Sequence, residues 1–340
     1  MNWGLGHASR CIPLITAMRE RGANIYLASD GEAGSLLQRE FPAIPFFTLP
    51  SYKIRYGRRS ALGGLIWRFP GIFNAISREK KAFDGLLEKY PADLIISDNR
   101  YGCWSKEAPS ALITHQLTLA GHSSIKGIGK KILAHWFSSF DEIWVPDWSG
   151  DNALAGKLSK GRFSKPVRYL GILSRMREET GAYDIDILSV ISGPEPLRST
   201  FEKQILEQLS QIPGNHMIVR GTETQADLKP PGNIQILDLA DSNTLQSYMN
   251  RAKFLVTRAG YSTLMDLVQM GKQALIVATP GQPEQEYLAD YHKPKKYWLV
   301  QDQPDLILDH AIANYTSMVP IRSKKMELGN WLDAIEKILS

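Results

Sequence analysis

The sequence predicts an α/β protein made of two successive halves, each built on a largely parallel sheet. Short apolar runs of strand length alternate with helical stretches through both halves, which is typical of strand–helix–strand units. The chain has 340 residues, 43% of them hydrophobic and 22% charged, and this is enough for two domains with separate cores.

The elements of the first half follow from apolar periodicity. They are helix 12–21, strand 24–28, helix 32–40, and strands 94–97, 111–114 and 142–145. The second half repeats the alternation after residue 184. Its expected elements are strand 187–191, helix 198–209, strands 216–219 and 234–236, helix 245–250, strand 254–256, helix 262–270 and strand 274–278.

The boundary between the halves falls between Val167 and Tyr183, because the polar stretch 175–183 separates two apolar series. We therefore expect an N-terminal domain over 1–170 and a C-terminal domain over 171–322. The last segment, 323–340, is expected to be a docking helix, because its apolar residues recur at helical spacing: Met326, Leu328, Trp331, Leu332, Ile335 and Leu339.

The turn Gly4-Leu-Gly-His7 reads as the end of a first strand, although only three residues precede it. In a doubly wound sheet that strand is central, so its neighbours would be left unpaired. Either translation starts upstream, or another element takes the place of this strand in the sheet. We expect the upstream start, which a measurement of the intact mass of the native protein tests.

Residues of this first turn are candidates for chemistry. Gly4 and Gly6 let a ligand approach the backbone at a helix start, and His7 can take a proton from a hydroxyl near neutral pH. His115 follows a strand at its carboxyl end, and an acceptor-side role and a structural role are both open for it. Asp30 stands where an NAD enzyme places its ribose-binding acid, so an oxidoreductase is one alternative. A purely structural role for the turn Gly4-Leu-Gly-His7 is another.

The segment Arg258–Asp266 carries the strongest signal, a buried strand followed by a small-residue turn and a helix. Ala259 and Gly260 keep the turn small, and Ser262 or Thr263 can cap the helix, so backbone N–H groups and the helix dipole favour a phosphate there. Asp266, one turn further on, is expected to accept hydrogen bonds from ribose hydroxyls, with a solvated helix acid as the alternative. Arg258 is a candidate partner of the leaving diphosphate.

Three further groups complete the predicted donor site. Ser192 and Gly193 follow the first strand of the second half and offer a second place for a diphosphate, or form a rigid turn. Arg220 ends the next strand and faces either a phosphate or a neighbouring carboxylate. A polar loop after Pro280-Gly281 supplies groups suited to sugar hydroxyls: Gln282, Glu284, Gln285 and Glu286.

Charge and composition limit the class of protein without selecting one. A formal charge of +5 is mild and fits a phosphorylated metabolite, an anionic membrane surface or nucleic acid equally. Two cysteines at no paired spacing, no apolar run of transmembrane length and no signal peptide predict a cytoplasmic protein. Motifs of metal sites, P-loops and serine hydrolases are absent from the sequence.

Basic and aromatic residues interleave at 52–59 and 65–73. Such a surface can hold an anionic acceptor or lie against a membrane, and a loop followed by a core helix is the structural alternative.

The residues quoted above resemble those of a known family. Arg258-Ala-Gly-Tyr261-Ser-Thr-Leu-Met-Asp266 and Gly281-Gln-Pro-Glu-Gln-Glu286 are similar to the donor-nucleotide signature of the GT-B glycosyltransferases, and Gly4-Leu-Gly-His7 resembles their N-terminal glycine loop. The likeness is to the branch around MurG and the bacterial predicted glycosyltransferases with a family 28 C-terminal domain, and it covers nearly the full chain. It implies two Rossmann-like domains facing a cleft, a C-terminal helix crossing back to the N-terminal domain, and a UDP-sugar bound mainly by the second domain.

The resemblance also assigns roles. Asp266 stands where the family has a ribose-binding Glu, Gln285 matches a sugar-contacting Gln, and His7 matches the histidine suspected as the base. Glu286 stands where a second Gln is common, and the loop at Gly4 is shorter than the glycine run of MurG. The resemblance therefore transfers neither the donor sugar nor the acceptor.

The hypothesis from the sequence is a metal-independent glycosyltransferase of hexosyltransferase type, with a UDP-sugar as donor substrate and no cofactor. Its partners would be the nucleotide sugar and an unknown hydroxyl acceptor, lipid-linked or anionic, with peripheral contact to the inner face of the membrane and no nucleic acid. A GT-B sugar-nucleotide epimerase or hydrolase and a nonenzymatic nucleotide-sugar-binding protein stay open, and an NAD oxidoreductase is a more distant alternative.

Overall fold

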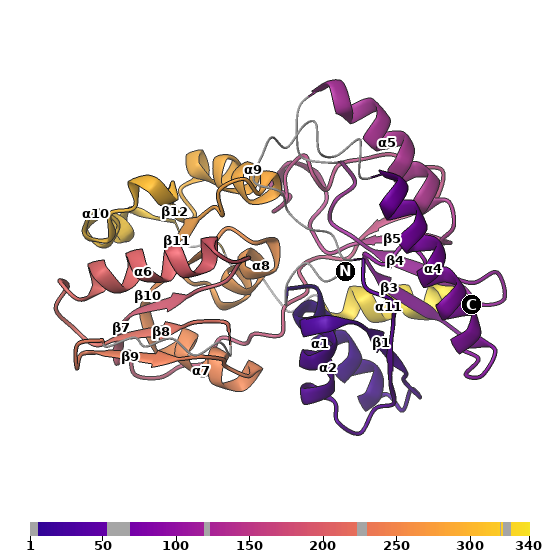
Figure 1. Cartoon of the computed structure of the whole chain (residues 1–340), viewed down its shortest axis with the longest axis horizontal. Helices are drawn as coiled ribbons and strands as arrows, with labels where there is room; N and C mark the ends of the chain where they lie inside the picture. Colours follow the sequence, from indigo (N-terminus) through magenta and orange to yellow (C-terminus); the bar gives the residue numbers. More distant parts are fainter. Residues whose placement is uncertain (1–5, 53–68, 119–122, 223–229, 320, 322–327) are drawn as a thin grey trace. The chain divides into compact units, whose positions relative to one another are not determined.

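The fold is taken from a computed structural model of the whole chain, which describes residues 6–52, 69–118, 123–222, 230–319, 321 and 328–340. The chain divides into two compact units, one formed by Met1–Ser174 with Lys325–Ser340 and the other by Arg175–Lys324 (Figure 1). Gly4 and residues 53–68 of the basic and aromatic stretches lie outside the described residues.

The first unit is built from short parallel strands and longer helices. Its elements are α1 (Gly6–Glu20), β1 (Leu27–Ser29), α2 (Gly31–Glu40), β2 (Phe46–Thr48), α4 (Phe69–Leu87), β3 (Ile95–Asp98), β4 (Ser110–Ile113), α5 (Ser123–Phe137), β5 (Glu142–Val145), η1 (Gly150–Asn152), β6 (Val167–Tyr169) and α11 (Leu328–Leu339). In the described residues the strands form a two-stranded sheet, β1-β2, and a four-stranded parallel sheet, β3-β4-β5-β6.

Both faces of the larger sheet are covered by helices. On β4, Leu112 packs in a cluster with Leu133 and Phe137 of α5, while Ala111 and Ile113 pack on the other face against α1 and α11. Because each face is buried, every residue of β4 and β5 is buried, and the strands read as continuous apolar runs rather than alternating ones.

Helix α11 belongs to the first unit, although it lies at the end of the chain. Trp331 packs edge-on against Trp144 of β5, with ring centroids 6.2 Å apart, and Ile335 lies in the same cluster as Leu14 of α1. Four of the six apolar residues that predicted a docking helix lie in or against this cluster: Leu328, Trp331, Leu332 and Ile335. Leu339 is exposed, and Met326 lies outside the described residues.

The second unit is a doubly wound α/β domain. Its elements are β7 (Ile185–Val190), α6 (Leu197–Leu209), β8 (His216–Val219), β9 (Ile234–Leu237), α7 (Ser242–Arg251), β10 (Ala252–Arg258), α8 (Tyr261–Met270), β11 (Ala274–Val277), α9 (Pro283–His292), η2 (Lys293–Lys295), β12 (Leu299–Gln301), η3 (Gln303–Asp305), α10 (Leu308–Asn314) and η4 (Tyr315–Ser317). In the described residues the strands pair in parallel in the order β12-β11-β10-β7-β8-β9.

This strand order places the topological switch point between β7 and β10. From there the strands continue to β8 and β9 on one side and to β11 and β12 on the other. Phe201 and Ile205 of α6 and Leu308 of α10 fill one face of the sheet, and Figure 1 shows these two helices together on one side. The carboxyl ends of β7 and β10 are therefore the place where this fold leaves room for a ligand.

The structure differs from the sequence expectation at several elements. The predicted polar loop over 282–286 is wrong, because α9 begins at Pro283 and takes in Glu284, Gln285 and Glu286. Helix α1 begins at Gly6 rather than residue 12, since Ala8 and Ile12 pack together against α2 despite Pro13 inside the helix. The periodicity gave no indication of β2, α4, α5, β6, β12 and α10.

Two described ends of the basic and aromatic stretches are integrated into the first unit. Tyr52 is buried with its hydroxyl on Glu79, and residues 69–73 open α4. Among the described helices, none combines the length and the apolar character needed to cross a bilayer.

Candidate functional site

The predicted donor residues gather at the carboxyl edge of the sheet in the second unit. Ser192 and Gly193 follow β7, and Ala259 and Gly260 follow β10, so they flank the switch point. Gly193 has a φ of +115°, which an L side chain rarely adopts, so the turn after β7 requires a glycine.

Helix α8 begins directly after this edge. The expectation that Ser262 or Thr263 caps it is wrong: the helix starts at Tyr261, and Gly260 is the N-cap residue with no side-chain cap. Gly260 has no side-chain oxygen to cap the helix, and the positive end of the helix dipole lies at this edge. Tyr261 itself is buried, and Asp266 is half-buried on the next turn.

Arg258 ends β10 and is fully buried. Its guanidinium donates to the carbonyls of Ser192 at 3.4 Å, Leu197 at 3.2 Å and Ala278 at 3.2 Å. Burial lowers the pKa of Arg258 to about 9, so it stays charged at neutral pH. The arginine therefore ties the connection between β7 and α6 to the turn after β11, and it presents no exposed surface to a phosphate.

Arg220 is likewise used within the protein. Its Nε donates to Glu202 at 2.5 Å and its Nη1 to Asp238 at 2.5 Å, and the side chain is buried. Of the two alternatives for this residue, a phosphate or a carboxylate, the structure shows the carboxylates.

The turn 279–282 is held by side chains from the start of α9. Gln285 accepts from the N–H of Thr279 at 2.9 Å and donates to Gln282 at 2.7 Å, and Glu286 accepts from the N–H of Gly281 at 2.7 Å. These side chains shape the loop after β11 from within, and Glu284 lies beside them in the same helical turn.

Thr279 was not among the residues singled out from the sequence. In the described structure its buried Oγ1 has no hydrogen-bond partner. A Cβ built on Gly193 would lie 3.5 Å from that oxygen, so the hydroxyl faces the turn after β7. A buried hydroxyl without a partner costs stability, which is a reason to expect a ligand that supplies one.

In the first unit, His7 lies at the start of α1 beside the carboxyl end of β3. Its Nδ1 is 2.8 Å from Oδ1 of Asp98, the last residue of that strand. A carboxylate at this distance requires a proton between the two atoms, so we assign the proton to Nδ1, which leaves Nε2 as the basic nitrogen. The pair has the arrangement of a general base and its orienting acid.

The surroundings of His7 disfavour a charge on it. Burial and the neighbouring Arg10 lower the pKa of His7 to about 4, although Asp98 opposes the change. Burial raises the pKa of Asp98, but Arg10 and His7 outweigh it and hold that pKa well below its usual range. At neutral pH His7 is therefore an uncharged imidazole beside an ionised carboxylate.

His115 and Gly6 lie near the same group of residues. His115 is buried after β4, with Nδ1 3.4 Å from Nη1 of Arg10, which places it in the structural part of the cluster. Gly6 opens α1, and its carbonyl accepts from the hydroxyl of Ser9 at 3.0 Å.

Asp30 does not have the environment of a ribose-binding acid. It is buried after β1 and forms an ion pair with Arg100, whose Nε also donates to Glu79 at 2.6 Å. The ion pair and the burial of Asp30 disfavour the NAD alternative; its buried Oδ2 has no hydrogen-bond partner among the described residues.

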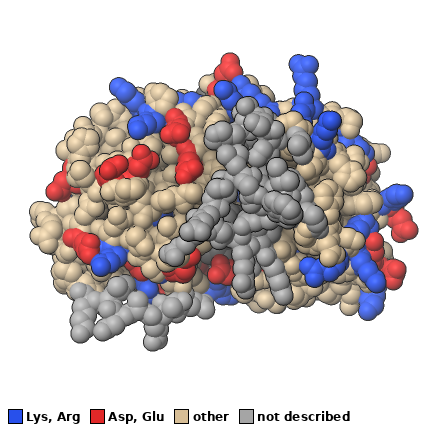
Figure 2. Space-filling view, turned by 45° about the horizontal axis from the view of Figure 1, so that its top comes forward, with Lys and Arg blue, Asp and Glu red and all other residues tan. Residues whose placement is uncertain are grey.

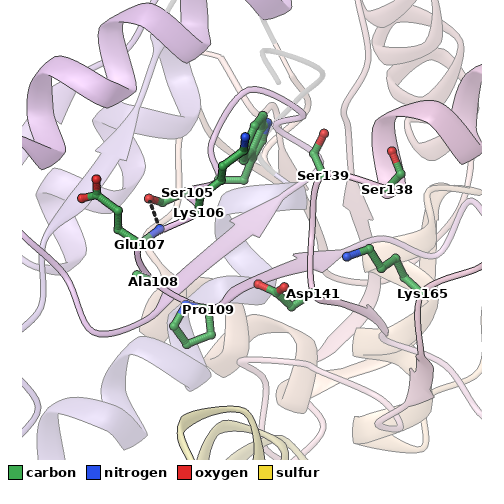
Figure 3. A pocket seen from close by; sticks show the side chains of 10 residues that line it. Ser105, Lys106, Glu107, Ala108, Pro109, Ser138, Ser139, Asp141 and Lys165 are labelled. Carbon is green, nitrogen blue, oxygen red and sulfur yellow. Dashed lines mark hydrogen bonds between the residues drawn. The ribbon is translucent and has the colours of Figure 1, made fainter.

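Two pockets among the described residues of the first unit are lined by other residues. One of about 590 Å³ is lined by residues around the amino ends of β4 and β5, among them Ser105, Asp141 and Lys165 (Figure 3). Within it the hydroxyl of Ser105 accepts from the N–H of Glu107 at 3.0 Å. A second pocket, of about 710 Å³, lies between α4 and α5 and is lined by Phe73, Tyr101, Trp136 and Lys80. The first lies opposite the carboxyl edge, where α/β sheets bind their ligands.

Among the described residues that Figure 2 colours, surface charge does not mark a further site. Figure 2 shows Lys and Arg side chains interspersed with Asp and Glu rather than gathered into one large basic area. Among the described residues, no group of three or more His, Cys, Asp or Glu side chains is placed to hold a metal ion.

Sequence reasoning missed Asp98 and Arg10 as well as Thr279. Asp98 directly follows the predicted strand 94–97, so its place at a carboxyl end was a usable signal. Arg10 is three residues after His7, which becomes one helical turn only when α1 is known to begin at Gly6. The helix at 283–292 also had a signal, since Pro283 is a typical first residue of a helix.

The chain is similar in sequence to known glycosyltransferases. Residues 199–325 match the model described as glycosyltransferase family 28 C-terminal domain. Two archaeal proteins, each named an uncharacterized glycosyltransferase, are similar to the chain: one from Methanosarcina acetivorans is 22% identical and one from Methanosarcina mazei is 23% identical. Each alignment covers 83% of this chain and 79% of the relative. The curated relatives are thus archaeal, whereas the sequence resemblance was to a bacterial branch.

Solved structures share the fold over nearly the whole chain. The glycotransferase of kitacinnamycin has a TM-score of 0.65 at 11% identity, covering 98% of this chain and 96% of its own. The MurG of Acinetobacter baumannii has a TM-score of 0.53 at 12% identity, covering 98% and 91%. The spinosyn rhamnosyltransferase SpnG, complexed with thymidine diphosphate, has a TM-score of 0.60 at 12% identity, covering 98% and 93%. The fold is that of the GT-B glycosyltransferases, and with the family match it supports a glycosyltransferase enzyme.

Proposed function

We propose that this chain, whose residues 199–325 match the glycosyltransferase family 28 C-terminal domain within a GT-B fold, transfers a sugar from a nucleoside diphosphate sugar to a hydroxyl acceptor. The observation that carries the proposal is the carboxyl edge at the switch point of the second unit. Three features at this edge suit the binding of a diphosphate: the turn after β7, the N-terminus of α8 and the hydroxyl of Thr279.

The nucleotide is proposed to be UDP. Asp266 would accept hydrogen bonds from the ribose hydroxyls, while the α8 N-terminus and the turn at Ser192 and Gly193 bind the diphosphate. Gln282, Glu284, Gln285 and Glu286 frame the loop beside the sugar. Support for a pyrimidine nucleotide comes from the similar rhamnosyltransferase, which is complexed with thymidine diphosphate.

In the proposed reaction His7 is the base. Its Nε2 takes the proton of the acceptor hydroxyl while the acceptor oxygen forms a bond to the anomeric carbon of the donor sugar. The bond from that carbon to the diphosphate breaks, and the diphosphate leaves with the electron pair. Charge develops on the leaving group, where helix amides stabilise it without reorganising, so the proposed mechanism is independent of a metal ion.

The acceptor is proposed to be lipid-linked or anionic, with the chain at the inner face of a membrane. The interleaved basic and aromatic residues at 52–59 and 65–73 support this. A cytoplasmic location is proposed with it, because Cys11 and Cys103 are free and one of them is buried.

Calorimetric titration of UDP, TDP and NAD into the protein and its Asp266→Ala variant tests the proposal. We expect UDP to bind and to bind more weakly in the variant by about 1 to 3 kcal/mol, the worth of hydrogen bonds to a charged group. Binding of NAD without UDP would overturn the donor assignment.

Two other functions are distinguished by the products. UDP released from a UDP-sugar without any acceptor indicates an epimerase or hydrolase. UDP-sugar binding with no turnover under any acceptor indicates a nonenzymatic binding protein. Transfer of the sugar to an acceptor hydroxyl is the outcome that the proposal expects.

A further inference from the structure

Arg10 contacts both His7, the proposed base, and Asp98, its acid, and the proposed function gives Arg10 no role. The side chain is buried on α1, one helical turn after His7. Its Nε donates to Oδ2 of Asp98 at 2.6 Å, and its Nη2 donates to Oδ1 of the same carboxylate. The guanidinium therefore holds both oxygens of Asp98 in a forked pair.

The same guanidinium also lies against the imidazole. Nη2 of Arg10 is 2.9 Å from Nδ1 of His7, while Nη1 is 3.4 Å from Nδ1 of His115. With the Nδ1 proton of His7 directed at Asp98, Arg10 presents a positive charge to the ring without competing for that proton. A protonated His7 would face this fixed charge at close range.

We infer that Arg10 is a positioning residue that keeps His7 uncharged near neutral pH and leaves its Nε2 available to the acceptor hydroxyl. This inference rests on the proposed function for its catalytic meaning. In an ordinary carboxylate–imidazole pair the carboxylate favours the imidazolium form. Here the carboxylate is already neutralised by the forked pair with Arg10, so that stabilisation is largely withdrawn.

The other groups that face the pair do not replace Arg10. Cys11, on α1, has its Sγ 3.3 Å from Oδ2 of Asp98, and burial raises the pKa of its thiol, so it is neutral. Asn99 after β3 is uncharged, with Nδ2 3.4 Å from Nδ1 of His7. Burial likewise raises the pKa of Tyr101, and His115 contacts the cluster through Arg10.

The experiment is a proton NMR titration of the histidine C2–H resonances of the full chain between pH 4.5 and 8. The His7 resonance is assigned by its absence in His7→Gln. In the unchanged protein we expect His7 to stay neutral down to about pH 5. In Arg10→Met we expect its midpoint to rise by at least about one pH unit, because Asp98 then acts on the ring without a competing cation.

Arg19→Met, an exposed position on the same helix, is the matched control and should leave the His7 midpoint unchanged. Should Arg10→Met fail to fold, Arg10→Gln is the substitute, because it removes the charge and keeps a hydrogen-bond donor, and the same rise is expected. A His7 midpoint in the Arg10 variant equal to that of the unchanged protein overturns the inference.

The titration needs no substrate, so it separates this inference from the proposed function. If the midpoint rises but no sugar transfer is found, Arg10 keeps its role on His7 and the transferase assignment fails. If transfer is found, the acid limb of the kcat/KM profile should move to higher pH in Arg10→Met by the same interval as the NMR midpoint.

Discussion

The guanidinium carbon of Arg258 lies 3.8 Å from the centroid of the Phe201 ring, and both side chains are fully buried. Phe201 belongs to the main cluster of the second unit, so the arginine joins that cluster to the loops at the carboxyl edge. A cation over an aromatic face is favourable when both are desolvated. Arg258 thus makes the position of the β7–α6 connection and of the turn after β11 depend on the packing of the core.

Replacement of Arg258 by Lys should destabilise the second unit and weaken UDP binding. A lysine keeps the charge but cannot donate to the carbonyls of Ser192, Leu197 and Ala278 together. The expected cost is about 1 to 3 kcal/mol in the unfolding free energy, from buried carbonyls left without donors. Urea denaturation followed by circular dichroism measures it, and an unchanged midpoint contradicts the role given to Arg258.

Five of the six strands described in the second unit were predictable, because they are apolar runs bounded by turns. The expected strand 216–219 coincides with β8, and the expected helix 198–209 differs from α6 by one residue. In the first unit, the expected strand 142–145 coincides with β5. The short strands β2, β6 and β12, each of three residues, have too few positions for a period to show.

The position of the candidate site in the fold could be predicted from the sequence, but the contacts of its side chains could not. The positions after β7 and β10 could be read from strand ends, since parallel strands present their carboxyl ends at one edge. Arg258 and Arg220 could not be assigned in the same way. Whether a buried arginine meets a carbonyl, a carboxylate or a ligand depends on long-range packing that a single sequence does not display.

His7→Asn should lower kcat by about 10²- to 10⁴-fold, the usual contribution of a general base. Donor affinity should be unchanged, because His7 belongs to the first unit and the proposed nucleotide contacts to the second. Steady-state kinetics with a UDP-sugar, together with UDP calorimetry, checks both parts. Full transfer activity in the variant removes His7 as the base.

Stability should fall as the pH is lowered, in a window set by His7. Its pKa is about 4 in the folded protein and near 6.5 when unfolded, so the unfolded chain binds more protons between these values. The contribution of His7 is fully present above pH 6.5 and is lost as the pH falls toward 4. The expected loss by pH 4.5 is about 2.5 kcal/mol.

The lowered pKa of Asp98 adds to the acid sensitivity in a separate window. Its stabilisation is present above the pKa of an unfolded aspartate, near 3.9, and is lost below it. Because the Asp98 window lies at lower pH, the change in unfolding free energy between pH 7, 5.5 and 4.5 reports mainly on His7. The unfolding free energy should therefore fall less steeply over these pH values in His7→Gln than in the unchanged protein. Equal slopes for the two proteins would show that His7 is not the titrating group.

Thr279→Val should weaken UDP binding without loss of stability. The hydroxyl has no partner among the described residues and faces the turn after β7, so valine of the same shape removes an unsatisfied group from the free protein. In the complex it removes a donor to the diphosphate, at an expected cost of about 1 kcal/mol, or roughly fivefold in Kd. Ser189→Ala is the control, because its buried hydroxyl within β7 also has no partner in the described chain. If calorimetry shows that both variants bind UDP as tightly as the unchanged protein does, the Thr279 hydroxyl does not bind the diphosphate.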